Sequence, residues 1–188
     1  MTLPTPTSDP GRVSRRTCLR AFGAACAGAF VAPLEALAAG VSTRSLSFVH
    51  THTRETMSIV YRVGGEYVSS SLARLQQYLR DHYTGAEHPI EPGLYDLLHA
   101  VSTSAGQPGA FHVISAYRSP ETNARLRTRS GGVASHSLHM EGKAIDIRLP
   151  GLPLRELREH ALSLARGGVG FYPGSDFVHV DTGRVRAW

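Results

Sequence analysis

SLHMEGKAID at residues 137–146 and DFVHVD at residues 176–181 are the two stretches that decide how this chain folds and what it can bind. Together they offer His139, Asp146 and His179 as a set of three metal ligands. Three protein ligands leave a fourth position for water, which distinguishes a catalytic zinc site from a structural one. Mixed nitrogen and oxygen ligation suits zinc better than magnesium or calcium, and manganese and iron remain alternatives. The two stretches therefore predict a metal-activated hydrolase.

The alternation of apolar and polar residues explains how the three ligands can meet. In the first stretch it predicts a strand with Asp146 on the face opposite two isoleucines. In the second it predicts a strand with His179 on the face opposite two valines. His139 comes from the loop before the first strand, and Gly142 permits that loop to bend sharply. If the two strands are neighbours in one sheet, the three side chains converge.

The N-terminal segment indicates where the protein acts. Residues 14–20, SRRTCLR, form a twin-arginine signature, and an alanine-rich apolar run follows that is short for a transmembrane helix. The sequence ALA at residues 36–38 is an A-x-A cleavage pattern. We expect residues 1–39 to be a twin-arginine signal peptide and residues 40–188 to be a periplasmic domain that meets the membrane only through that signal. An uncleaved anchor and lipidation at Cys26 are the alternatives.

The length and composition of residues 40–188 are typical of a single globular domain. About 149 residues remain after the leader, a common size for one domain with its own core. Both cysteines lie in the leader, so the domain needs no disulfide. The remainder carries 16 basic and 13 acidic residues, with Lys143 as its one lysine. No basic run with interleaved aromatic residues suggests nucleic acid, and we expect a monomer.

The hydrophobic pattern predicts an α+β fold: a single domain with a mainly antiparallel sheet flanked by helices. Strands are expected over residues 44–50, 57–63, 66–68, 111–117, 143–149, 169–172 and 176–181. Helices are expected over residues 70–79, 92–105, 120–129 and 153–166. The Gly-Gly pair at residues 64–65 predicts a hairpin between the second and third strands.

The pattern Ser-x-His-x-x-Gly-x-Ala-x-Asp with a later His resembles the zinc D-Ala-D-Ala carboxypeptidase superfamily, which has a hedgehog/DD-peptidase-like fold. The likeness extends to SAYRSPETN at residues 115–123 and to FVHVDTGRVRAW at residues 177–188. With the twin-arginine leader, these blocks most resemble the YcbK/MepK-like branch of murein endopeptidases. The resemblance covers about residues 45–188.

This resemblance implies a function and a ligand set. It implies a zinc metallopeptidase that hydrolyses the peptide crosslinks of peptidoglycan, with the peptide stems of that polymer as its binding partner. One Zn²⁺ ion per chain is expected, held by His139, Asp146 and His179. The resemblance does not choose between a D,D and an L,D bond.

The resemblance also implies roles for the residues around the ion. Arg118 matches an arginine that contacts substrate and stabilises charge in the transition state. Asp176 stands where some relatives carry a catalytic Glu, so it is the expected general base, with Asp181 or a substrate-assisted route as alternatives. Asp181 could instead orient the last histidine ligand through its other ring nitrogen. Ser137 is expected to support the metal loop, and His136 could line the site.

Two other functions stay open. One is a carboxypeptidase or dipeptidase that trims the ends of the stems. The other is a non-catalytic zinc-bearing cell-wall binding module, which would keep the metal ligands and lose the base. Among the other candidate residues, Tyr117 and Trp188 are interpreted as packing residues or walls of a subsite. The remaining histidines are interpreted as core or surface residues: His50, His52, His82, His88, His99, His112 and His160.

Overall fold

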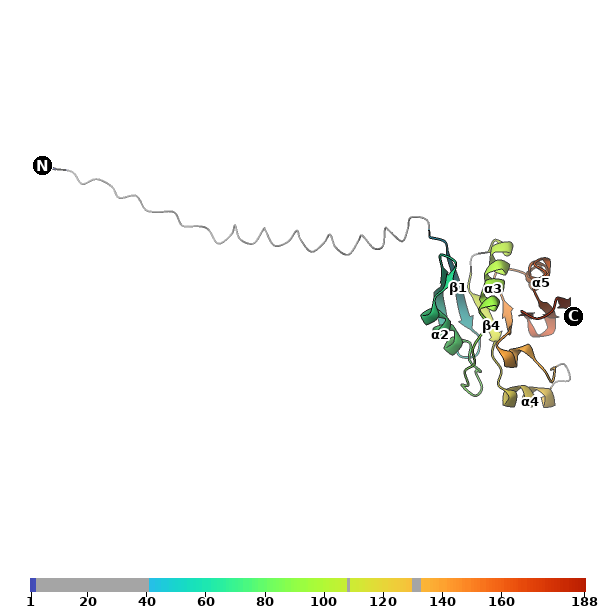
Figure 1. The fold of residues 1–188 in the computed structure, drawn as a ribbon. Helices are drawn as coiled ribbons and strands as arrows, with labels where there is room; N and C mark the ends of the chain where they lie inside the picture. The colour runs from blue at the N-terminus through green and yellow to red at the C-terminus, as the bar shows by residue number, and fades with distance from the viewer. Residues whose placement is uncertain (3–40, 108, 130–132) are drawn as a thin grey trace. The chain divides into compact units, whose positions relative to one another are not determined.

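A mixed sheet of eight strands organises the described part of the chain, in which the folded unit runs from Ser42 to Trp188 of a computed structural model (Figure 1). The structure describes residues 1–2, 41–107, 109–129 and 133–188. The signal peptide expected over residues 1–39 lies outside these ranges except for its first two residues. Within them, no helix has both the length and the apolar character needed to cross a membrane.

The sheet is mainly antiparallel, as the sequence predicts. Its order is β3-β2-β1-β4-β5-β7-β6-β8, and only the β1–β4 and β6–β8 pairs are parallel among the described strands. The parallel pairs were not predicted, because they depend on long crossover connections rather than on local pattern, and β8 was not predicted because it is only two residues long. The strands are β1 (Thr43–His50), β2 (Thr56–Val63), β3 (Glu66–Tyr67), β4 (Phe111–Ser115), β5 (Ala144–Arg148), β6 (Gly168–Tyr172), β7 (Phe177–Asp181) and β8 (Arg186–Ala187).

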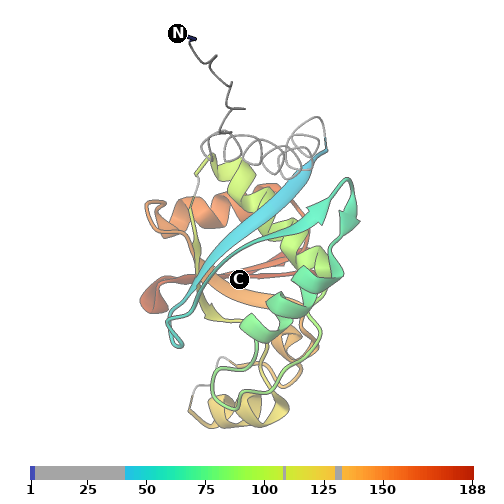
Figure 2. The ribbon, with the colours of Figure 1, turned by 90° about the vertical axis from the view of Figure 1, so that its left-hand side faces the viewer.

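The helices lie close to the predicted ranges. They are α2 (Ser69–Tyr78), α3 (Pro92–Ala105), α4 (Pro120–Arg129) and α5 (Leu154–Ser163), with 3₁₀ helices η1 (Leu138–Glu141) and η2 (Pro173–Ser175). Figures 1 and 2 show α3 and α5 side by side, and both contact the sheet. Helix α5 ends three residues earlier than expected, because Ala165 adopts a left-handed conformation with φ of 49° that a helix does not accommodate.

One face of β5 and β7 packs into the hydrophobic core, and the other carries polar side chains. On one face, two isoleucines of β5 and two valines of β7 are at most 1% exposed and belong to the hydrophobic core. Because side chains alternate along a strand, Asp146 and His179 lie on the other face. The prediction that these residues face away from the core is confirmed, and the sheet provides a rigid base for them.

One histidine lies in the core, away from that face. His50 is fully buried, and its Nδ1 accepts the backbone N–H groups of His52 (3.3 Å) and Thr53 (3.4 Å). Its Nε2 has no hydrogen-bond partner within the described ranges. Burial, together with the nearby His82 and His52, lowers the pKa of His50 to about 4. His50 is therefore neutral at pH 7.

This buried imidazole predicts a loss of stability in mild acid. In the unfolded chain the pKa of His50 is near 6.5, so between pH 6.5 and 4 the unfolded state binds the proton more readily than the folded state. Folding stability therefore falls as the pH drops through this window, by about 3 kcal/mol at its lower end. His50→Asn keeps an acceptor near the Nδ1 position and does not titrate. Urea unfolding of the two proteins should show a weaker pH dependence for the variant; equal slopes would contradict the assignment.

Candidate metal centre

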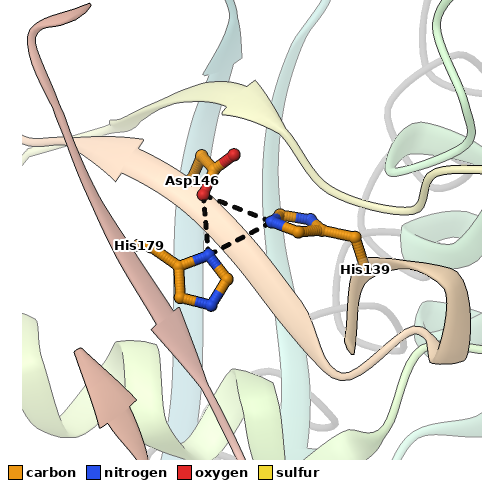
Figure 3. Close-up of side chains that lie close together, drawn as sticks. All are labelled: His139, Asp146 and His179. Carbon is orange, nitrogen blue, oxygen red and sulfur yellow. Dashed lines mark hydrogen bonds and ion pairs between the residues drawn. The ribbon is translucent and has the colours of Figure 1, made fainter. Parts of the chain in front are cut away.

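Three side chains from neighbouring elements converge on the far side of the sheet from the core (Figure 3). His139 lies in η1, Asp146 in the middle of β5, and His179 in the middle of β7. Strands β5 and β7 are adjacent, with Asp146 directly opposite His179 in the register, so the condition for convergence stated from the sequence is met. The exposed fractions of the three residues are 3%, 4% and 8%. His139 belongs to a short 3₁₀ helix rather than to the loop that was expected.

Gly142 turns the chain from η1 into β5. It has φ of 65°, and a side chain there would overlap the carbonyl group of Pro89. Only glycine meets both conditions without strain, so the sharp bend predicted from the sequence is confirmed. The carbonyl of His139 also accepts the backbone N–H of Arg118 at 3.2 Å. This bond links η1 to the loop that carries Arg118.

The three facing atoms are spaced like the ligands of one ion. His179 Nδ1 lies 2.9 Å from Asp146 Oδ1, and His139 Nε2 lies 3.3 Å from the same oxygen. The two imidazole nitrogens are 3.2 Å apart. A tetrahedral zinc ion with bonds of about 2.0–2.1 Å separates its ligand atoms by about 3.3 Å. The spacing therefore fits a small divalent ion.

The outer partner of each ring determines which nitrogen is free to bind a metal. His139 Nδ1 lies 2.6 Å from the carbonyl oxygen of Ala116, which only accepts, so Nδ1 carries the proton and Nε2 presents a lone pair. His179 Nε2 lies 3.0 Å from the carboxylate of Asp181, which leaves a lone pair on Nδ1. With both imidazoles neutral, two lone pairs and a carboxylate oxygen face one another. Such a set of acceptors is stable when a cation lies among them, so the residues present fit a metal ion.

Hydrogen bonds hold both carboxylate oxygens of Asp181 in place. It is fully buried, and it accepts the backbone N–H groups of Gly168 (3.0 Å) and Gly183 (2.8 Å) and the guanidinium of Arg186 (2.7 and 3.0 Å). Burial alone would raise the pKa of Asp181, but its hydrogen bonds, first of all with His179 and Arg186, hold that pKa below its usual range. Asp181 is therefore a fixed anion behind the imidazole of His179.

The electrostatics of the three converging residues favour a positive charge. Burial opposes the ionisation of Asp146, but the two histidines outweigh it and hold its pKa below the usual range. Burial lowers the pKa of His139. Burial would also lower the pKa of His179, yet its hydrogen bonds with Asp146 and Asp181 outweigh burial and raise that pKa to about 9. The two carboxylates thus create a negative electrostatic potential, which would stabilise a bound metal cation as it stabilises a proton.

Substituting Asp181 should weaken metal binding without removing a ligand. Asp181→Asn keeps the size of the side chain but loses the charge that orients and polarises His179, so the dissociation constant for Zn²⁺ should rise about 10- to 100-fold. Competition with a chromogenic chelator measures this constant, and circular dichroism checks that the fold is kept. An unchanged dissociation constant in a folded variant would show that Asp181 only stabilises the backbone and Arg186 through its hydrogen bonds and does not support metal binding.

A cavity of about 440 Å³ opens beside the three converging residues. His136 and Ser137 lie on its wall, as does Arg118. The remaining lining residues are Val133, Ala134, Leu138, Tyr172, Ser175, Phe177, Arg186 and Trp188, together with the three ligands. His139, Asp146 and His179 thus line a cavity that a molecule can enter from solvent.

Comparison with known proteins assigns the chain to a family. The family model described as peptidoglycan L,D-endopeptidase MepK matches residues 38–188. The chain belongs to the MepK family. The peptidoglycan L,D-endopeptidase MepK of Escherichia coli strain K12 is 39% identical over 178 residues, which cover 93% of this chain and 97% of that protein. The probable peptidoglycan L,D-endopeptidase MepK of Haemophilus influenzae is 41% identical over 146 residues, 77% of this chain and 78% of that protein. The resemblance inferred from the motifs is confirmed.

Within this MepK-family chain, Arg118 is held loosely beside the three converging residues. Its guanidinium lies 3.6 Å from Asp146 Oδ2 and 3.5 Å from both Asn123 Oδ1 and Ser115 Oγ. Its side chain is 11% exposed, and its Nε has no partner among the described residues. These contacts are long for charged hydrogen bonds. Arg118 therefore retains hydrogen-bonding capacity for a molecule in the cavity.

Asp176 lies at the edge of the cavity but is turned toward a different partner. Its neighbours Ser175 and Phe177 line the cavity, whereas its own carboxylate pairs with Arg148 and is 62% exposed. Asp176 ends η2 with φ of 54°, a left-handed conformation that precedes the regular alternation of β7. The sequence placed Asp176 at the beginning of this strand but could not show the ion pair.

The contributions of Arg186 and Tyr172 to the cavity were not predicted from the sequence. Trp188 was expected to be a packing residue or a wall of a subsite. All three line the cavity, and Arg186 also holds Asp181. A signal was present, because Arg186 and Trp188 alternate after the turn at Gly183 as the residues of a strand do.

Proposed function

We propose that this protein is an exported zinc peptidase that cleaves peptide crosslinks of peptidoglycan. The observation that carries the proposal is the convergence of His139, Asp146 and His179 on the wall of an open cavity. Family membership supports the activity, and the names of the two relatives favour an L,D bond over a D,D bond. The twin-arginine leader over residues 1–39 supports a periplasmic location, where this polymer lies.

The donor set supports zinc, and the chain's own residues supply the rest of the chemistry. When bound, zinc provides Lewis acidity for activating a water molecule and polarising the scissile carbonyl. Arg118 donates hydrogen bonds to the oxygen that becomes negative, or holds a carboxylate of the substrate. Asp176 accepts the proton of the attacking water and returns it to the leaving amine.

Of the two aspartates that the sequence left open as the base, we favour Asp176. Asp181 is fully buried, and its oxygens are occupied by Arg186, two backbone N–H groups and the outer nitrogen of His179. It supports the ligand rather than the reaction. Asp176 has one exposed ion pair, and such pairs contribute at most about 1 kcal/mol. Rotation of its side chain away from Arg148 toward the cavity therefore costs little.

Crosslinked muropeptides test the proposed function. The zinc-loaded protein is incubated with dimers that contain either an L,D or a D,D crosslink, and the products are identified by mass spectrometry. Conversion of the L,D dimers to monomers supports the proposal. Release of single terminal residues would identify a carboxypeptidase instead. Intact dimers in the presence of one bound zinc equivalent would identify the binding module.

Arg118 provides a separate test of the transition-state assignment. Arg118→Ala should lower kcat about 10²-fold, because one donor to a developing oxyanion is lost, while the zinc content stays at one equivalent. Arg118→Lys keeps the charge but not the planar fork, so it should recover only part of the loss. Steady-state kinetics with a crosslinked muropeptide distinguish the variants. A normal kcat in Arg118→Ala would assign Arg118 a purely structural role.

A further inference from the structure

Trp188 is firmly held and yet remains 48% exposed in the cavity beside the metal ligands. Its backbone N–H donates to Val169 O at 3.2 Å, and its carbonyl accepts the N–H of Phe171 at 3.0 Å. Its indole Nε1 donates to the hydroxyl of Tyr172 at 2.7 Å. Backbone and ring are thus both fixed, while much of the ring surface stays open.

Gly170 makes the space in which this ring lies. It is paired with His179 across β6 and β7, and a Cβ atom at residue 170 would lie 2.7–2.9 Å from three atoms of the indole. Because glycine has no side chain, the ring of Trp188 extends across β6 to the metal ligand. The ring centroids of Trp188 and His179 are 5.2 Å apart. The guanidinium of Arg186 lies over the same indole, 4.8 Å from its centroid.

An aromatic ring held in this way is suited to binding. An exposed apolar surface in a cavity is unfavourable in water and is stabilised when an apolar group covers it. A ring whose orientation is already fixed loses little conformational entropy when that happens. The ring also adjoins His179, so a group that packs on it lies close to the bond that the metal centre would cleave.

We propose that Trp188 is a substrate-binding residue whose indole packs against the aliphatic part of the stem residue next to the cleaved bond. This inference rests on the proposed peptidase function.

Kinetics of three variants test the proposal. Trp188→Ala should raise KM for a crosslinked muropeptide about tenfold, with kcat within twofold of the wild type and unchanged zinc affinity. Trp188→Phe keeps an aromatic face and should raise KM less. Gly170→Ala displaces the indole and should raise KM as Trp188→Ala does. Tyr83, an aromatic residue of similar exposure (49%) that does not line the cavity, supplies the control Tyr83→Ala, which should leave KM unchanged.

Two results would overturn the proposal. One is an unchanged KM in Trp188→Ala. The other is a weakened zinc affinity with lower kcat at unchanged KM, which would make the ring a support for His179. If the wild type cleaves no muropeptide, the proposed function fails, and calorimetric binding of the same muropeptide to the zinc-loaded proteins decides this inference alone. Weaker binding to Trp188→Ala than to the wild type then supports it, and equal binding overturns it.

Discussion

Asp146→Asn is expected to lower the rate of crosslink cleavage by at least about 10³-fold and to reduce the bound zinc from one equivalent to almost none. The Asp146 carboxylate faces both imidazole nitrogens, at 2.9 and 3.3 Å, and it is the one anionic ligand of the set. Asparagine preserves its shape but removes the charge that attracts the ion. Loss of the Lewis acid removes several kcal/mol of transition-state stabilisation. Elemental analysis and the cleavage rate of the same preparation measure both effects.

Asp96→Asn is the matched control for that substitution. Asp96 is also a buried aspartate, but its partners are Arg44, Arg62 and two tyrosine hydroxyl groups, away from the metal ligands. Its substitution should lower the melting temperature and leave the zinc content at one equivalent. Full zinc content and activity in Asp146→Asn would refute the ligand assignment. Equal zinc loss in both variants would show that unfolding, not ligand removal, releases the metal.

Asp176→Ala is expected to lower kcat about 10³-fold while one zinc equivalent stays bound. Removal of a general base costs about 10²- to 10⁴-fold in rate, and Asp176 contacts none of the metal ligands in this structure. Asp176→Glu should retain measurable activity, because a longer carboxylate on an exposed turn can still reach the cavity. Steady-state kinetics and zinc content are measured for each variant.

Arg148→Ala separates the base from its ion pair. It leaves the carboxylate of Asp176 in place and removes its cationic partner, so cleavage should stay within about tenfold of the wild type. Full activity in Asp176→Ala would contradict the assignment and favour a base supplied by the substrate. A large loss in Arg148→Ala alone would show that the ion pair itself, rather than a free carboxylate, is required.

The sequence predicts the metal face well because strand alternation is a local property. The opposite orientation of Asp146 and its isoleucine neighbours needs only the period of two, and the same holds for His179 and its valines. The bend at Gly142 is likewise a property of one residue. The pairing of β5 with β7 could not be predicted from the sequence and entered only as a condition for convergence. It is met because β6 and β7 form a hairpin-like pair after α5, which brings β7 beside β5.

The remaining features depend on contacts between distant parts of the chain. The ion pair of Asp176 with Arg148 joins residues 28 positions apart, and it follows a left-handed turn that alternation does not describe. The position of Trp188 requires that β8 lie next to β6 and that Gly170 leave the space open. Neither condition can be deduced from the pattern of β8, which is only two residues long.

Removal and return of the metal is the sharpest test of zinc-dependent cleavage by this protein. The wild-type protein is stripped with a chelator and then titrated with Zn²⁺ while cleavage of an L,D-crosslinked muropeptide is followed. We expect no cleavage by the stripped protein and full recovery at one equivalent of zinc, with no recovery in Asp146→Asn. Undiminished cleavage by protein whose metal content is below detection would contradict zinc-dependent catalysis.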